Sequence, residues 1–156
     1  MMEIDIPGFR SLRLHHLVMD YNGTLARDGD IIDGVAERLS ALSADLTLHV
    51  VTADTFGKAR DQLQGIAAEL LILPENGQEK RKLEYVSALG ASACVCIGNG
   101  RNDRLMLREA ALGIVVINAE GCAIEAHASA DVACASIADA LDLLLHPRRL
   151  IATLRS

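Results

Sequence analysis

Large aromatic side chains are nearly absent from this sequence of 156 residues. It has no tryptophan, and aromatic residues make up only 3% of the chain, although 51% of its residues are hydrophobic. The core must therefore be built from aliphatic side chains, which is typical of helices packed on a sheet. A chain with this much hydrophobic sequence is not expected to be disordered.

Long hydrophobic runs are also missing. No apolar stretch approaches the roughly 20 residues that cross a bilayer, and the N-terminal segment MMEIDIPGFR is acidic where a signal peptide would be basic. The formal net charge is -6, whereas a general nucleic-acid-binding protein needs a basic face. We expect a cytoplasmic protein that binds neither membranes nor nucleic acids.

Cysteine is scarce, and its spacing does not define a site. The four cysteines lie among apolar or small residues, and no second Cys/His pair stands at a ligand-like distance from the Cys-X-Cys segment. Buried free thiols are favoured, and a metal or redox site remains the alternative. The residues concerned are Cys94, Cys96, Cys122 and Cys134.

No repeat, low-complexity tract or linker divides the chain, and its length suits a single domain over residues 1–156. Strand-like and helix-like segments alternate, which predicts an α/β fold: a three-layer, Rossmann-like, doubly wound and mostly parallel sheet with helices on both faces. The expected strands are 14–20, 46–52, 70–75, 93–98, 113–118 and 131–136. The expected helices are 33–45, 55–69, 78–90, 102–111, 123–130 and 137–146.

The two ends of the chain lie outside this alternation. Residues 1–13 alternate apolar and polar side chains, which predicts an added strand or hairpin. The tail 147–156 is predicted to add a further helical turn, and its apolar side chains could form a contact between copies of the chain. On that ground we expect a homo-oligomer.

Polar residues stand where the predicted strands end. The first strand ends at Asp20 and the second at Thr52, while Lys82 lies on the helix before the fourth strand. Since the carboxyl ends of parallel strands line one crevice, we expect these side chains to converge. The fourth strand is followed by glycines, amides and an acid, namely Gly98, Asn99, Gly100, Asn102 and Asp103.

This set of side chains suits phosphoryl transfer. A carboxylate can attack phosphorus when a magnesium ion and a lysine neutralise the charge of the phosphate. Each residue also has a purely structural interpretation: Asp20 could belong to a turn, Thr52 could simply be a β-branched strand residue, Lys82 could lie on a solvated helix face, and Asp103 could be an acid in a first helical turn.

The ordered segments DYNGT, VVTAD, KLEYVSAL and IGNGRND resemble the four motifs of the haloacid dehalogenase superfamily. They are most similar to the soluble relatives of the P-type ATPase phosphorylation domain, and the resemblance covers essentially the whole chain. It implies a magnesium-dependent phosphohydrolase or phosphotransferase that acts on a phosphorylated substrate. The intervals between the motifs leave no room for a cap domain.

The resemblance also implies roles for individual residues. Asp20 would accept the phosphoryl group, Thr52 and the N–H of Ala53 would hold it, and Lys82 would balance its charge. The residues implied in substrate binding are Gly23, Thr24, Ala53 and Asn102. Those implied at the metal site are Asp20, Asn22 through its main-chain carbonyl, Asn99 and Asp103.

Two positions depart from the usual pattern of the family, and both lack a carboxylate. Asn22 stands where most phosphatases have the general acid–base aspartate, so we expect slow turnover. Asn99 stands where a metal-binding aspartate is usual, so we expect weaker metal binding. The alternative function is a regulatory or phosphate-binding module of the same fold. No histidine replaces the missing acid, and those on the strands are expected to be structural: His15, His16 and His49.

Overall fold

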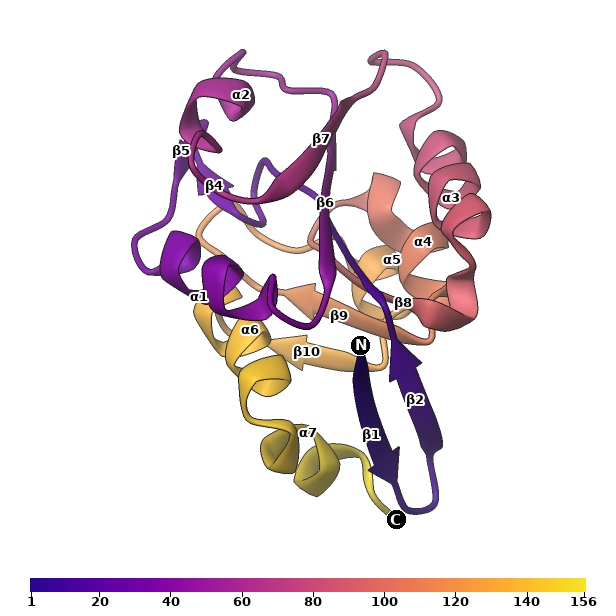
Figure 1. Cartoon of the computed structure of the whole chain (residues 1–156). Helices are drawn as coiled ribbons and strands as arrows, with labels where there is room; N and C mark the ends of the chain where they lie inside the picture. Colours follow the sequence, from indigo (N-terminus) through magenta and orange to yellow (C-terminus); the bar gives the residue numbers. More distant parts are fainter.

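The computed structural model describes residues 1–156, and its centre is a six-stranded sheet in which every neighbouring pair is parallel. The strand order is β10-β9-β8-β3-β6-β7. Figure 1 labels each of these strands except β3, which lies between β8 and β6. The predicted α/β fold and all six predicted strands are confirmed. Their bounds are β3 His16–Met19, β6 Thr47–Thr52, β7 Ala68–Ile72, β8 Cys94–Gly98, β9 Leu112–Val116 and β10 Val132–Cys134.

Helices cover both faces of the sheet. On one face, α3 (Gln78–Leu89), α4 (Arg104–Glu109) and α5 (Ile124–His127) enclose a cluster of 11 buried apolar residues. On the other, α1 (Val35–Leu42) packs against α6 (Ile137–Leu145) over a cluster of 29. Central strands buried on both faces need continuous apolar runs, which is what the sequence supplies.

The region between β6 and β7 differs from prediction. A helix was expected over 55–69, but α2 spans only Ala59–Gln62. Gly57 and Gly65 flank it with φ of 68° and 81°, a left-handed conformation that no helix continues through. Ala68 and Glu69 then pair with Leu48 and His49 as the start of β7. Pairing in the sheet therefore overrides their helical propensity.

Two further details of the chain's first third were not predicted. The helix expected over 33–45 begins only at Val35, because Gly34 before it is in a left-handed conformation with φ of 82°. A small hairpin of β4 (Ala26–Arg27) and β5 (Asp30–Ile31) projects from the loop after β3. Strands of two residues carry too little alternation to be found in a sequence.

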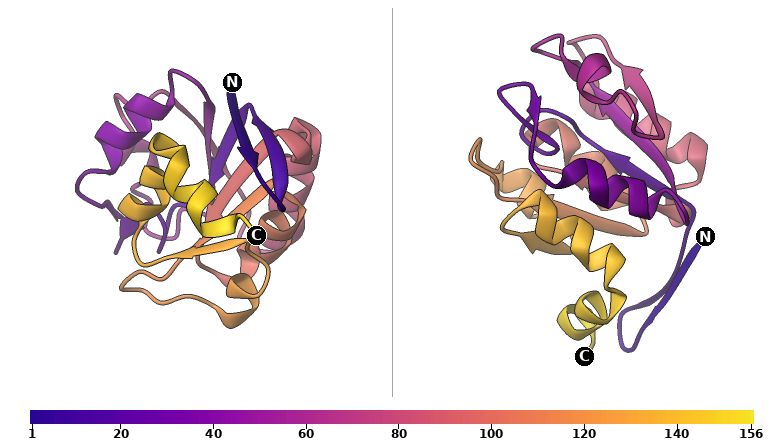
Figure 2. Two further views of the ribbon diagram at one scale, coloured as in Figure 1. Left: turned by 90° about the horizontal axis from the view of Figure 1, so that it is seen from below. Right: turned by 60° about the vertical axis from the view of Figure 1, so that its left-hand side comes forward.

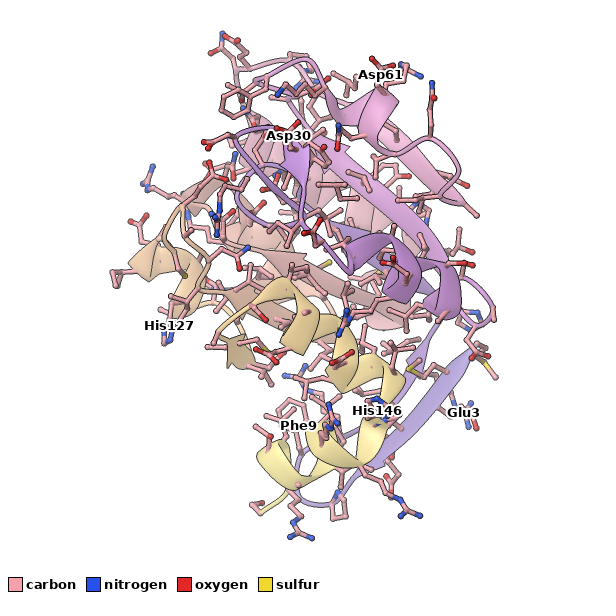
Figure 3. All side chains as sticks on the ribbon, turned by 90° about the vertical axis from the view of Figure 1, so that its left-hand side faces the viewer. Glu3, Phe9, Asp30, Asp61, His127 and His146 are labelled. Atoms are coloured by element: carbon pink, nitrogen blue, oxygen red, sulfur yellow. The ribbon has the colours of Figure 1, made fainter.

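The ends of the chain form a unit of their own. The predicted hairpin is confirmed as β1 (Met2–Ile6) paired with β2 (Arg10–Leu14), and the tail forms α7 (Pro147–Leu154). The apolar face of α7 packs against this hairpin, and Leu150 is fully buried there. Figure 2 shows the hairpin and α7 together at one end of the molecule, and Figure 3 labels Phe9 and His146 at that end.

The side chains of the strand histidines pair with one another at the edge formed by the starts of β3, β6 and β7. His16 Nδ1 lies 3.1 Å from His49 Nε2, and His49 Nδ1 lies 2.9 Å from the hydroxyl of Tyr85 on α3. Burial lowers the pKa of both imidazoles. They lie at the opposite ends of these strands from the predicted site.

The cysteines are free thiols, and Cys94, Cys96 and Cys134 are buried as expected, whereas Cys122 is partly exposed. No helix is long and apolar enough to span a bilayer.

Candidate active site

Three strands end at one cavity of about 210 Å³. Asp20 follows β3, Thr52 ends β6, and Asn99 follows β8, and all three line it. The Asp20 N–H donates to the carbonyl of Ile97, so β3 and β8 hold the acid between them. The other lining residues are Asn22, Ala53, Thr55, Gln78, Gly100 and Asn102. The predicted convergence of the strand ends is therefore observed.

Lys82 joins the two acids of the site. Its ammonium group donates at 2.7 Å to Oδ1 of Asp20 and at 2.7 Å to Oδ1 of Asp103. Lys82 and Asp103 are 0% exposed, and Asp20 is 7% exposed. A lysine on a solvated helix face would not be buried between two carboxylates, so that interpretation of Lys82 is wrong.

Burial and the neighbouring charges shift the pKa values of Asp20 and Lys82. Burial raises the pKa of Asp20 to about 6, with a further contribution from the neighbouring carboxylate of Asp103, while Lys82 opposes the rise. Burial by itself lowers the pKa of Lys82, but the carboxylates of Asp103 and Asp20 outweigh it, so its pKa is raised. Two acidic side chains therefore surround a single lysine, and this excess of acidic groups favours an additional cation.

Both carboxylate oxygens of Asp103 accept hydrogen bonds. While its Oδ1 accepts from Lys82, its Oδ2 accepts from the backbone N–H groups of Asn99 at 3.0 Å and Gly100 at 2.9 Å. Asp103 thus positions both the lysine and the loop after β8. Its predicted role as a metal ligand stays a prediction.

The loop after β3 approaches the loop after β8 closely. Gly23 has φ of 77°, and a Cβ atom there would collide with the amide of Asn99. The Thr24 hydroxyl lies within hydrogen-bond distance of two acceptors. One is Asn99 Oδ1 at 3.1 Å, and the other is Asp20 Oδ2 at 3.4 Å. The tight turn in the sequence therefore brings two predicted site loops into contact.

Asn118 is a residue that the sequence did not reveal. Its side-chain amide donates to the carbonyls of Gly23 at 2.9 Å and Thr24 at 3.0 Å, from the loop after β9. Asn99 Nδ2 donates to Gly121 in the same loop at 3.1 Å. The loop after a fourth strand, β9, thus holds the loop after β3 in place, and an isolated asparagine after a strand gives no signal of this in the sequence.

The donor set around the cavity fits a hard divalent cation. No three His, Cys, Asp or Glu side chains form a metal cluster, but oxygen atoms from Asp20, Asn22 and Asn99 border one cavity. The side-chain oxygen of Asn22 is buried with no hydrogen-bond partner, and an orphaned acceptor of this kind is costly unless a donor or cation meets it. Magnesium takes oxygen ligands and retains water, which suits this arrangement.

Solved structures of other proteins share this fold. A cobalt-bound deoxy-D-mannose-octulosonate 8-phosphate phosphatase from Haemophilus influenzae superposes with a TM-score of 0.72 over 92% of this chain and 94% of that one, at 14% identity. The 3-deoxy-D-manno-octulosonate 8-phosphate phosphatase from Moraxella catarrhalis was solved with magnesium, phosphate and KDO. It superposes with a TM-score of 0.62 over 91% of this chain and 94% of that one, at 23% identity. The fold is that of the haloacid dehalogenase superfamily, as the motifs predicted, with no added cap domain.

The resemblance to ion pumps is also seen in structure. A zinc-transporting PIB-type ATPase in its E2.Pi state aligns with 79% of this chain and 20% of its own, with a TM-score of 0.62 and 23% identity. Only the fold is shared at this level of identity.

Sequence relatives come from the archaeon Methanocaldococcus jannaschii. The uncharacterized protein MJ0073 is 51% identical over 61 residues, which are 39% of this chain and 66% of that protein. The uncharacterized protein MJ0072 is 44% identical over 39 residues, 25% of this chain and 89% of that protein, so the chain belongs to the same family as MJ0072. No protein-family model matches the chain.

Proposed function

We propose that the protein is a magnesium-dependent phosphohydrolase that works through an aspartyl phosphate on Asp20. One observation carries this proposal: the buried Lys82 ammonium lies 2.7 Å from both Asp20 and Asp103, and Asp20 lines a cavity formed by strand ends. The phosphatase names of the structural neighbours support it.

Each side chain then has a part in the reaction. Lys82 holds Oδ1 of Asp20, which leaves Oδ2 to attack phosphorus while the bond to the leaving oxygen breaks. The Thr52 oxygen accepts from the N–H of Asp54 at 2.9 Å, so its own proton can be donated to a phosphoryl oxygen. Water then attacks the phosphorus of the aspartyl phosphate, which releases inorganic phosphate and regenerates Asp20.

The metal would be held by oxygen atoms of Asp20, Asn22 and Asn99, with Asp103 as the second acid of the site. When bound, magnesium supplies positive charge that stabilises the developing charge on the phosphoryl oxygens. Asn22 cannot donate a proton to the leaving oxygen, so that proton must come from water. General acid–base help is typically worth about 10²–10⁴-fold in rate, and its absence makes slow turnover the expected outcome.

The test is hydrolysis of 4-nitrophenyl phosphate with and without magnesium. Asp20→Asn removes the attacking oxygen and is expected to lower kcat by at least about 10³-fold. Asp45→Asn is the matched control, because Asp45 is an exposed aspartate at the opposite end of the sheet, before β6. Equal rates in the wild type and in Asp20→Asn would overturn the mechanism.

The alternative is a module that binds phosphate or a partner without turnover. It is favoured by the two asparagines, Asn22 and Asn99, that stand in place of carboxylates at the cavity. Titration calorimetry with inorganic phosphate and magnesium, beside a phosphate-release assay on a panel of phosphate esters, separates the two functions. Binding with no release from any ester favours the module.

A further inference from the structure

A second hollow, of about 460 Å³, opens beside the active-site cavity. It lies between the first turn of α3 and the loop after β8, and it shares Gln78, Gly100 and Asn102 with the cavity. If a phosphate ester binds with its phosphorus at Asp20, the esterified group can therefore extend into this hollow. What lines the hollow bears on which leaving group the protein accepts.

None of the eight residues that line this hollow is hydrophobic. Besides the three shared residues, the lining includes Glu75, Glu79, Arg101 and Arg104. An aromatic or aliphatic leaving group would meet only the aliphatic stems of polar side chains and no hydrophobic residue, so it would gain less from the hydrophobic effect than in an apolar pocket. It would also displace water from groups that then lack hydrogen bonds.

The hollow presents both donors and acceptors. The Asn102 side-chain NH₂ donates to Gln78 Oε1 at 2.8 Å, and Gln78 Nε2 donates to the Glu75 carbonyl at 3.0 Å, which leaves the Asn102 amide oxygen as an acceptor. No side chain caps the N–H groups at the start of α3, so these remain as donors. Hydroxyl groups donate and accept at once, and so can satisfy both kinds of partner.

The charges of the hollow do not favour a second anion on the substrate. Arg104 pairs with Glu79 at 2.6 Å, and Arg101 pairs with Glu125. The carboxylate of Glu75 forms no ion pair, so it is the uncompensated charge. A leaving group with its own carboxylate or phosphate would meet this like charge.

An apolar groove does exist, but it is separate from the cavity. It has a volume of about 190 Å³, seven of its 11 lining residues are hydrophobic, and they include Ile32, Ile117 and Ile137. It shares no lining residue with the active-site cavity. The polar hollow is therefore the extension of the site.

We propose that the leaving group of the substrate is an uncharged, polyhydroxylated chain or ring, as in a polyol or sugar phosphate. Glu75, Gln78 and Asn102 bind its hydroxyl groups. This inference rests on the proposed function, because it assumes that a phosphate ester is bound with its phosphorus at Asp20.

Three phosphates with the same six-carbon chain test the inference: glucitol 6-phosphate, 6-phosphogluconate and hexyl phosphate. The first has hydroxyls and no further charge, the second adds a carboxylate, and the third lacks the hydroxyls. We expect kcat/KM for glucitol 6-phosphate to exceed that for each of the others by about tenfold, since one or two interactions differ.

A charge variant sharpens the comparison. Glu75→Gln removes the uncompensated carboxylate and is expected to raise kcat/KM for 6-phosphogluconate relative to glucitol 6-phosphate by about three- to fivefold. The control is Glu84→Gln, which removes the same charge from an exposed position on α3 outside the hollow. The control is expected to leave the ratio at its wild-type value.

The outcomes distinguish this inference from the proposed function. If Asp20-dependent hydrolysis occurs but hexyl phosphate or 6-phosphogluconate is preferred, the inference is wrong and the phosphatase function stands. An unchanged ratio in Glu75→Gln contradicts the role of that residue in rejecting anions. Release of phosphate from no ester at all overturns both proposals.

Discussion

Asp20 lies in an environment that favours its neutral form, although the proposed chemistry needs its charged form. Burial raises its pKa to about 6, Asp103 adds to the rise, and Lys82 limits it. The folded protein therefore bears a cost above that pH, because it holds an ionised carboxylate that water would solvate better. Active sites commonly keep such costs because function depends on them.

Asp20→Asn is expected to stabilise the metal-free protein at neutral pH. The ordinary pKa of 3.8 is raised to about 6 on folding. Above about pH 6 the carboxylate is ionised in both states and the folded state carries the full cost, of about 1 to 3 kcal/mol, which Asn removes. Between about pH 6 and 4 the folded wild type takes up a proton and gains stability, so the advantage of the variant declines toward zero.

Urea unfolding with a chelator present, at about pH 7.5 and about pH 4.5, measures this difference. The free energy of unfolding should be higher for Asp20→Asn at the first pH and nearly equal at the second. A variant less stable than the wild type at the higher pH would show that the ion pair with Lys82 outweighs burial.

Asn22→Asp is expected to raise kcat on 4-nitrophenyl phosphate by about 10- to 100-fold, because a carboxylic acid at this position can protonate the leaving oxygen and then activate water. The rate at saturating substrate is the quantity to measure, since binding of the phosphate need not change. A lower kcat would mean that another group already moves the proton and that Asn22 is required as an amide.

Among the elements, α7 shows that the apolar side chains of the tail are buried by packing within the same chain. The hydrophobic residues of the tail predict a contact between copies, but α7 packs against β1 and α6 of the same chain, and its Leu150 is fully buried. The expectation of a homo-oligomer stays a prediction and now lacks that support.

Leu150→Ala should lower the free energy of unfolding by about 2–4 kcal/mol, because it leaves a cavity between α7 and the hairpin. Ile124→Ala is the control, since Ile124 is 82% exposed and its truncation should cost little. Both variants are compared by urea unfolding, and kcat should stay unchanged because α7 lies far from the strand ends of the site. A change below about 1 kcal/mol for Leu150→Ala would indicate that α7 is only loosely docked.

At the scale of the whole molecule, the sequence predicted the sheet well because its strands are buried on both faces and read as continuous apolar runs. Lys82 and Asp103 were found from motif order, yet only the structure shows that one ammonium joins both acids. The contacts of Asn118 and Gln78 could not be predicted, because an isolated amide belongs to no motif and its partners lie on loops that are distant in the sequence. The helix expected over 55–69 failed where glycine conformation and strand pairing outweighed local propensity.

The terminal hairpin and α7 have a practical consequence. The N-terminal amine contacts the carbonyl of Asp45, just before β6, and Ser156 donates to Pro7 in the hairpin turn. The N-terminus thus lies at the side of the sheet where β6 begins and the C-terminus lies at the turn of the hairpin (Figures 1 and 2), whereas Thr52, at the other end of β6, lines the cavity. An affinity tag, a fluorophore or a tether to a solid support can be attached at either terminus while the mouth of the cavity remains open to bulky esters.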